Sequence, residues 1–149
     1  MSKVQFVANG NTQQIEKFIN YVMLDGKKNT ARRLVKDTFQ IIKDKTKENP
    51  TKVFEEAVEN VKPSLEVKAR RVGGAVYQVP MEVKPKRQFQ IACKWIIGAA
   101  RGKKGAPMSK RLADELIQAF NNEGNAVKKK EDTHRMAQAN KAFAHFARY

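Results

Sequence analysis

Residues 65–85 are the most informative segment of the sequence and read LEVKARRVGGAVYQVPMEVKP. Apolar and polar residues alternate with a period of two in residues 65–72 and again in residues 75–83. Gly73 and Gly74 separate the two runs and favour a tight turn. The segment therefore predicts a β-hairpin over about residues 65–83.

The alternation allows two registers for this hairpin. A two-residue turn would pair Leu65 with Glu82 and would mix apolar and polar residues on both faces. A three-residue loop, residues 73–75, would pair Val67 with Met81 and would gather the apolar residues on one face. We expect the three-residue loop, with a glycine at positive φ.

The polar face of the hairpin points to a nucleic-acid partner. In the expected register it carries Lys68, Arg70 and Gln78. Lys68, Arg70 and Arg71 are candidates to bind phosphates, and Tyr77 is a candidate to stack on a base or to hydrogen bond. The alternative is an edge hairpin whose charges only keep it soluble. The surrounding charge favours nucleic acid.

Charge is concentrated in the middle of the chain. The 149 residues include 30 Lys and Arg and 15 Asp and Glu, which gives a net charge of +15 and a pI near 10.1. Residues 61–105 hold eleven bases and two acids, a net charge of +9, and the segments on either side carry +3 each. A domain this basic needs a polyanion as its partner.

Composition excludes several other classes of protein. With 41% hydrophobic and 30% charged residues, the chain is typical of one globular domain, residues 1–149. Its apolar runs are far shorter than the ~18 residues of a membrane span. A single cysteine excludes an internal disulfide and favours a reducing compartment.

Helical spacing dominates outside the hairpin. Apolar residues recur at helical spacing near residues 15–23, 34–42, 53–58, 89–100 and 109–124. A sixth helix is expected to run to near Phe146, and its start stays open because Lys128, Lys129 and Lys130 can lie before it or in its first turn. We expect Asn29 or Thr30 to cap the second helix, and Asn49 with Pro50 to start the third. The predicted fold is mainly α: about six helices in one domain, with a protruding hairpin between the third and fourth, and an extended segment at residues 1–11.

The fourth helix carries a basic stripe. Arg87, Lys94 and Arg101 recur every seven residues, which keeps them within ~40° of one another around the helix. They lie opposite the apolar positions, and no acid occurs in residues 85–105. An ordinary exposed face would mix the two signs of charge, so we interpret the stripe as a phosphate-binding face.

Two basic loops complete the candidate surface. Gly26-Lys27-Lys28 is no Walker A loop, because Tyr21 stands at the first glycine position and Lys28 replaces Ser or Thr. Residues 102–105 match a G-x-x-G clamp, but their helical flanks exclude the sheet of a KH domain. We interpret both as basic loops between helices, which can still touch phosphate. Further candidates for nucleic-acid contacts are Lys27, Lys28, Lys103, Lys104, Lys128, Lys129 and Lys130.

Catalytic and metal-binding patterns are weak. His134 and His145 would lie ~16 Å apart along one helix and cannot share a metal ion. Cys93 lies near an apolar helix face, where a buried, unreactive thiol is expected. Glu66 and Glu82 would face each other in the expected register, which is too little for a two-metal nuclease. We therefore expect no enzyme activity, metal or cofactor.

Three segments resemble one protein family. Residues 25–28 (DGKK), residues 65–85 and residues 125–146 (NAVKKKEDTHRMAQANKAFAHF) closely resemble the bacterial and organellar type of ribosomal protein seven of the small subunit. The resemblance extends over about residues 18–146. It implies a six-helix bundle with a hairpin that binds the 3′ major domain of small-subunit rRNA and nucleates assembly of the subunit head.

The resemblance also implies contacts and a location. It implies rRNA contacts at Lys27, Lys28, Lys68, Arg70 and Arg71, with the hairpin tip around Gly73, Gly74 and Tyr77 near the exit-site tRNA and the messenger. It implies a place at the subunit interface, with small-subunit proteins nine and eleven as neighbours and neither membrane nor small-molecule substrate. The implied location is the ribosome in the cytoplasm, of bacterial origin, with an organellar ribosome as the alternative.

Two departures from the family limit these implications. Residues 1–14 contain Lys3 as their one base, where family members begin with an Arg-rich extension. The chain ends Ala147-Arg148-Tyr149, where the family commonly has Arg-Trp after the last aromatic residue. Contacts made by those two segments in the family, including part of the protein-eleven interface, are not carried over.

Two other functions compete with the ribosomal one. A DNA-binding helical regulator would bind a DNA duplex as well as an rRNA junction of equal charge. A basic amphipathic protein of membrane surfaces would float with anionic liposomes. The second is the weaker alternative, because the apolar face opposite the basic stripe is needed for the core.

Overall fold

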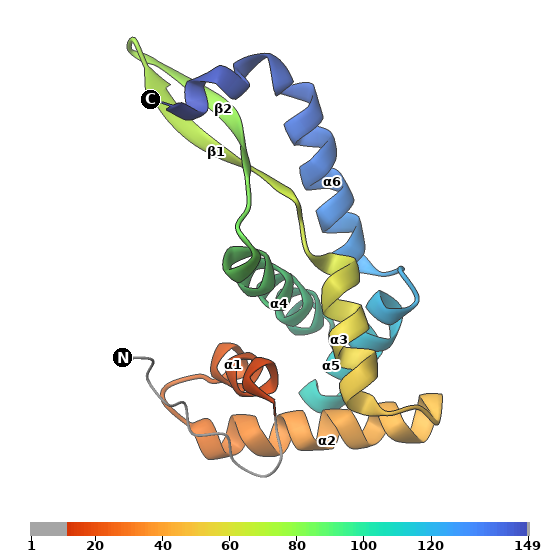
Figure 1. Cartoon of the computed structure of the whole chain (residues 1–149). Helices are drawn as coiled ribbons and strands as arrows, with labels where there is room; N and C mark the ends of the chain where they lie inside the picture. Colours follow the sequence, from red (N-terminus) through yellow and green to blue (C-terminus); the bar gives the residue numbers. More distant parts are fainter. Residues whose placement is uncertain (1–11, 149) are drawn as a thin grey trace.

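The computed structural model describes residues 12–148, which form helices and one antiparallel hairpin (Figure 1). The elements are α1 (Gln13–Val22), α2 (Lys28–Thr46), α3 (Pro50–Val61), β1 (Leu65–Val72), β2 (Ala75–Glu82), α4 (Pro85–Gly102), α5 (Met108–Phe120), α6 (Asn125–Ala139) and the 3-10 helix η1 (Lys141–Arg148). The expected mainly-α fold, with the hairpin between the third and fourth helices, is confirmed. The expectation of an extended segment at residues 1–11 lies outside the described residues.

The helices pack around one apolar core. Phe54 of α3 lies near its centre, with its ring 5.0 Å from that of Phe18 and 5.8 Å from that of Phe39. The largest fully buried apolar side chains among the described residues come from helices α1 to α5: Phe18, Ile19, Ile42, Phe54, Ile96, Leu112 and Leu116. These are the residues that recur at helical spacing in the sequence, and their burial supplies the main driving force for folding.

Helix starts follow the expected chemistry in one case and not in another. The Asn49 side chain accepts a hydrogen bond from the Thr51 N–H (3.0 Å), and Pro50 is the first residue of α3, as expected. The expected cap of α2 at Asn29 or Thr30 is wrong, since α2 begins at Lys28 and Lys27 occupies the N-cap position. A left-handed turn at Asp25 and Gly26 (φ 53° and 72°) redirects the chain before those residues are reached.

The last two α-helices end earlier than their apolar pattern suggests. α5 ends at Phe120 and not near Gly124, because Asn122 adopts a positive φ of 60°. α6 ends at Ala139 and does not continue to Phe146. There the Asn140 side chain donates to the Met136 carbonyl (2.8 Å), and the chain continues as the tighter helix η1.

The expected hairpin register is wrong. Leu65 pairs with Glu82 and Lys68 with Val79, so the turn has two residues, Gly73 and Gly74. Both glycines have positive φ (59° and 84°), as a type I′ turn requires, and the twist of that turn matches the twist of the strands.

The hairpin tolerates apolar and polar residues on both of its faces, because its base is buried on both faces and not on one alone. Val79 and Pro80 are consecutive residues and therefore point to opposite faces, yet both are buried. Val79 is 0% exposed although it lies opposite Lys68. Both faces are therefore covered near the hairpin base, and the rule of one apolar face does not apply.

The hairpin projects from the helical body together with the end of α6 and with η1 (Figure 1). We call β1, β2 and residues 132–148 the arm. The arm is joined to the body where the Ser64 N–H donates to Nε2 of His134 (3.0 Å). Just before the arm begins, Lys130 Nζ of α6 donates to the Asn60 carbonyl near the end of α3 (2.9 Å). None of the helices among the described residues is long and apolar enough to cross a membrane.

Candidate nucleic-acid interface

The hairpin cations are divided between its two faces. Lys68 and Arg70 share one face, and Arg71 lies on the other because successive strand residues alternate. Gln78 pairs with Ala69, so it lies with Arg71 and not with Lys68 and Arg70, contrary to expectation. Lys68 and Arg71 are exposed, whereas Arg70 is half-buried.

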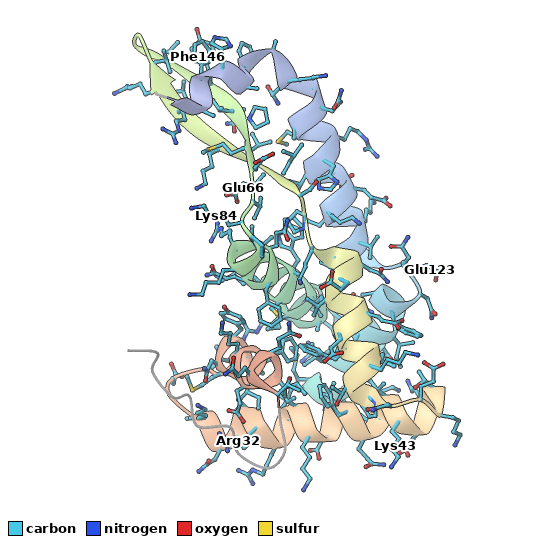
Figure 2. The ribbon with its side chains drawn as sticks, in the orientation of Figure 1. Arg32, Lys43, Glu66, Lys84, Glu123 and Phe146 are labelled. Atoms are coloured by element: carbon cyan, nitrogen blue, oxygen red, sulfur yellow. The ribbon has the colours of Figure 1, made fainter. Side chains whose placement is uncertain are left out.

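The two acids of the hairpin do not face each other, contrary to expectation. Glu66 pairs with Met81, and Glu82 pairs with Leu65 on the opposite face. The Glu66 carboxylate lies 3.5 Å from Lys68 Nζ and 3.6 Å from Arg87 Nη2, so it links the hairpin to the start of α4. Figure 2 shows Glu66 and Lys84 at this junction. The acid brings cations of two elements together.

The basic stripe on α4 has the expected orientation. Its apolar side is buried, with Ala92 and Ile96 fully enclosed, and Lys94 on the opposite side is exposed. Arg101 has a structural role as well, because its Nη2 donates to the Val22 carbonyl at the end of α1 (3.2 Å). That carbonyl has no partner within its own helix, so Arg101 joins α4 to α1.

A basic groove of about 630 Å³ lies between α1 and the start of α4. Its cations are Lys17, Lys62, Lys86 and Arg87, and within residues 12–148 no acid lines it. Tyr21 lies at the same groove, where burial, and secondly Cys93, raise the pKa of its hydroxyl and keep it protonated at neutral pH. No side chain of the described residues caps the N-terminus of α4, and the N–H groups of its first turn add positive potential.

Sequence reasoning missed most of this groove. Arg87 was the one lining residue expected in a binding role. Lys17, Lys62 and Lys86 come from three different helices or their ends, and only packing brings them together. The available signal was the cluster Lys84, Lys86 and Arg87 around the helix-starting Pro85.

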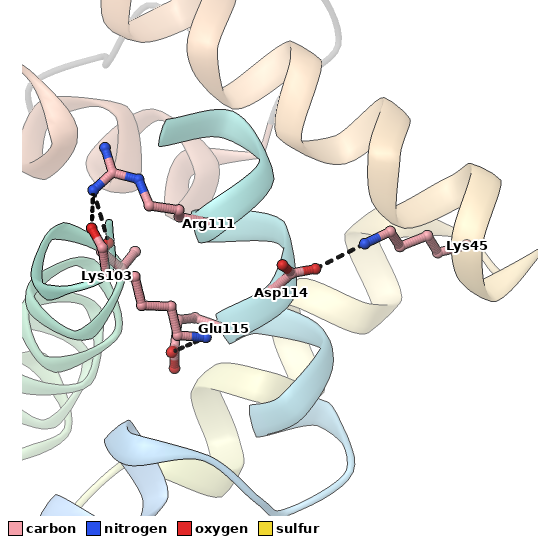
Figure 3. A network of polar contacts seen from close by, with 6 residues as sticks. Lys45, Lys103, Arg111, Asp114 and Glu115 are labelled. Atoms are coloured by element: carbon pink, nitrogen blue, oxygen red, sulfur yellow. Dashed lines mark hydrogen bonds and ion pairs between the residues drawn. The ribbon is translucent and has the colours of Figure 1, made fainter. Parts of the chain in front are cut away.

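The loop between α4 and α5 uses one of its two lysines internally (Figure 3). Lys103 Nζ lies 2.7 Å from Oε1 of Glu115, a carboxylate only 1% exposed. Arg111 holds the same loop by donating to the Lys103 carbonyl. Lys104 is exposed, and the helical flanks of the loop are as expected.

The remaining lysines also differ in role. Lys27 and Lys28 are exposed where α2 begins. Lys128, Lys129 and Lys130 lie inside the first turns of α6. Lys128 is exposed, Lys129 Nζ lies 5.9 Å from the centre of the Trp95 ring, and Lys130 is bonded to Asn60.

The helix α2 carries a second basic surface at the end of the body away from the arm. It has six bases and two acids, and Figure 2 shows Arg32 and Lys43 on it. The net charge of residues 1–60 is only +3 because six of the eight acids of that segment lie outside α2, so the net charge of the segment hides this surface.

The hairpin tip separates its three candidate residues. Gly73 and Gly74 form the exposed turn. The ring of Tyr77 instead packs within the arm, with its centre 5.1 Å from that of Phe143 and 4.7 Å from that of Phe146.

His134 and Cys93 have structural surroundings, whereas His145 is exposed in η1 and so does not share a helix with His134, contrary to expectation. Burial, and secondly the charge of Lys130, lower the pKa of His134, whose Nε2 accepts from Ser64. Burial raises the pKa of Cys93 to about 12, so its thiol stays protonated at neutral pH, as expected for an unreactive cysteine. Among residues 12–148, no three His, Cys, Asp or Glu side chains gather as a metal site would require.

Nearly the whole chain is similar to proteins of one known family. Residues 2–141 match the family model described as ribosomal protein S7p/S5e. The small ribosomal subunit protein uS7 of Thermotoga petrophila is 60% identical over 132 residues, which cover 89% of this chain and 85% of that protein. The protein of the same name from Moorella thermoacetica is 58% identical, with 92% and 87% of the two chains covered.

Proposed function

Because the chain belongs to the ribosomal protein S7p/S5e family, we propose that it is a primary rRNA-binding protein that nucleates assembly of the head of the small ribosomal subunit. Membership of this family makes the chain a structural protein of the small ribosomal subunit that binds rRNA and takes part in translation. We propose that residues 1–149 act as one rRNA-binding domain without enzymatic activity, cofactor or metal.

One observation carries this proposal: the basic groove and the hairpin base adjoin. Arg87 lines the groove and also lies 3.6 Å from Glu66 of the hairpin. Cations of α1, the end of α3, α4 and β1 therefore form one surface, which we call the basic surface: Lys17, Lys62, Lys68, Lys86 and Arg87. Lys62 offers less charge than the others, because its Nζ lies 2.6 Å from Oε1 of Glu59. Phosphates that replace counterions on such a surface release those ions, which supplies much of the binding free energy.

The proposed rRNA contacts extend over neighbouring elements. They are Lys27, Lys28, Lys68, Arg70, Arg71, Arg87, Lys94, Arg101, Lys103, Lys104, Lys128, Lys129 and Lys130, with Lys17 and Lys86 added from the groove. The exposed members are the strongest candidates. Lys103 and Lys130 already pair within the protein, which lowers the charge that they offer to RNA.

The finer placement in the ribosome follows from the family resemblance. We propose that the rRNA partner is the 3′ major domain and that the tip at Gly73 and Gly74 approaches the exit-site tRNA and the messenger. Small-subunit proteins nine and eleven are the proposed neighbours, at the subunit interface of a bacterial ribosome in the cytoplasm.

The test is a salt series with charge-reversal variants. The chain should bind a 3′ major domain transcript, and affinity should fall about a thousandfold between 50 and 200 mM salt if about six phosphates are contacted. Arg70→Glu with Arg71→Glu, and separately Lys86→Glu, should weaken binding and reduce the steepness of the salt dependence while circular dichroism stays unchanged.

Two comparisons make this test specific. Lys52→Glu is the matched control, because Lys52 is exposed in the first turn of α3, at the end of the body away from the arm. A DNA duplex of equal charge distinguishes a ribosomal protein from a DNA-binding regulator. Equal affinity for the duplex and the transcript would contradict the proposal, as would binding that ignores salt.

A further inference from the structure

The part of the hairpin nearest its tip is held by aromatic rings and not by the core. Tyr77 lies in β2 opposite Arg70. The rings of Phe143 and Phe146 lie within about 5 Å of it, at 5.1 and 4.7 Å between centres. We call these three residues the ring cluster; its members lie outside the core cluster that the described residues form.

The path of the chain after α6 brings the two phenylalanines to the hairpin. α6 stops at Ala139, and the Phe143 N–H donates to the Asn140 carbonyl (3.0 Å) at the start of η1. A 3-10 helix has about three residues per turn, so side chains three apart lie on one side. The rings of Phe143 and Phe146 are accordingly almost parallel, at 9° and 6.1 Å. Figure 2 shows Phe146 beside the hairpin.

The hairpin needs this support. A two-stranded hairpin alone is at best marginally stable in water. Near its tip, Arg71, Gln78 and residues 73–76 are exposed and bury little surface. Tyr77 is the half-buried residue of this part of β2, and its neighbours are the rings of η1.

We propose that Tyr77, Phe143 and Phe146 are positioning residues that order the hairpin before RNA binds. Arg70 shares its face with Tyr77, so the ring cluster also determines where that cation lies. A disordered hairpin would have to be ordered during binding, and the measured Kd rises in inverse proportion to the ordered fraction. This inference rests on the proposed rRNA-binding function.

The first experiment uses the free protein. Hydrogen exchange is measured on the full chain and on Phe143→Ala with Phe146→Ala. Amides of residues 69–79 should exchange at least about tenfold faster in the variant, because the ordered fraction of the hairpin falls, and those of α3 should not change. Met136→Ala is the matched control, since Met136 is an exposed apolar residue of α6 outside the ring cluster.

The second experiment measures binding of the same variants to the 3′ major domain transcript. The alanine variant should raise Kd about tenfold, as expected if one hairpin in ten stays ordered, with the same salt dependence, because no phosphate contact is lost. Phe143→Tyr with Phe146→Tyr keeps both rings and should restore both exchange and affinity. Tyr77→Leu replaces the double variant if the latter loses helical content.

The outcomes separate this inference from the proposed function. Unchanged exchange of residues 69–79, or faster exchange with unchanged Kd, overturns it. Weaker binding without faster exchange also overturns it, because the rings would then contact RNA directly. Loss of salt-dependent binding by the unaltered chain overturns the proposed function and the affinity half of the inference, while exchange still decides the ordering half.

Discussion

Lysine and arginine side chains have two different roles in this protein: some are exposed to a partner, and others form bonds within the protein. Lys94 and Lys104 are exposed and offer their full charge to a partner. Lys103, Lys130 and Arg101 are bonded to a buried carboxylate or to carbonyl groups near helix ends. Sequence position does not separate the two groups, since Lys103 and Lys104 are neighbours.

Lys103 should be needed for stability. Lys103→Met leaves the buried Glu115 carboxylate without its partner, which is expected to lower the free energy of unfolding by about 2–4 kcal/mol. Urea unfolding followed by circular dichroism measures the change. Lys104→Met is the control and should change stability by less than about 0.5 kcal/mol.

The reciprocal substitution checks the cause of that loss. Glu115→Gln removes the buried charge, so adding it to Lys103→Met should recover part of the lost stability. If the double variant is as unstable as the sum of the single variants, the ion pair is not what stabilises the loop.

Among the elements, the hairpin depends most on backbone conformation. Gly73 and Gly74 both adopt positive φ and form a two-residue turn. That turn sets the register in which Lys68 pairs with Val79. Val79 could be buried opposite a lysine because α6 and η1 pack against the hairpin. Turn geometry therefore outweighed the preference for one apolar face.

Gly74 should tolerate few substitutions. With φ at 84° and no atom within 4 Å of an added Cβ, Gly74→Val suffers backbone strain alone, about 1–2 kcal/mol. Loss of hydrogen-exchange protection in residues 69–79 measures it. Gly73→Asn should be nearly neutral, because asparagine is accepted at the first position of a type I′ turn. Equal protection in Gly74→Val and the unaltered chain would contradict the assigned turn.

At the scale of the whole molecule, a body buries the apolar core and an arm displays the hairpin. The two meet at a few polar contacts, among them the hydrogen bond from the Ser64 N–H to His134 Nε2. That bond needs a neutral ring nitrogen as acceptor. The attachment of the arm should therefore depend on pH.

The pH dependence has a definite sign. The pKa of His134 lies below its ordinary value of 6.5 in the folded protein, so the unfolded chain binds the proton more readily. Its contribution to stability should be complete above pH 6.5 and should be lost as the pH falls from 6.5 through the folded pKa. Melting temperatures at pH 7.5 and pH 5.5 measure this. The drop should be smaller in His134→Gln, and an equal drop in both proteins would refute the assignment.

The order and amphipathic faces of the helices follow from the sequence alone, because burial of one face imposes a local period of 3.6 residues. The start of α2 and the ends of α5 and α6 do not. The start of α3 at Asn49 and Pro50, the basic face of α4 and the glycine turn are local signals of the same kind. The family resemblance also needed only the sequence, since it rests on two long continuous segments.

Tertiary structure decided which charges act together. The groove brings together Lys17, Lys62 and Lys86 from separate parts of the chain. Glu115 forms an ion pair with Lys103 and not with the neighbouring Lys104. It also decided that η1 leaves the line of α6 and places Phe143 and Phe146 on Tyr77. Contacts between residues that are far apart in the sequence produce no repeating pattern in it, because each contact depends on how several helices pack and on where each helix ends.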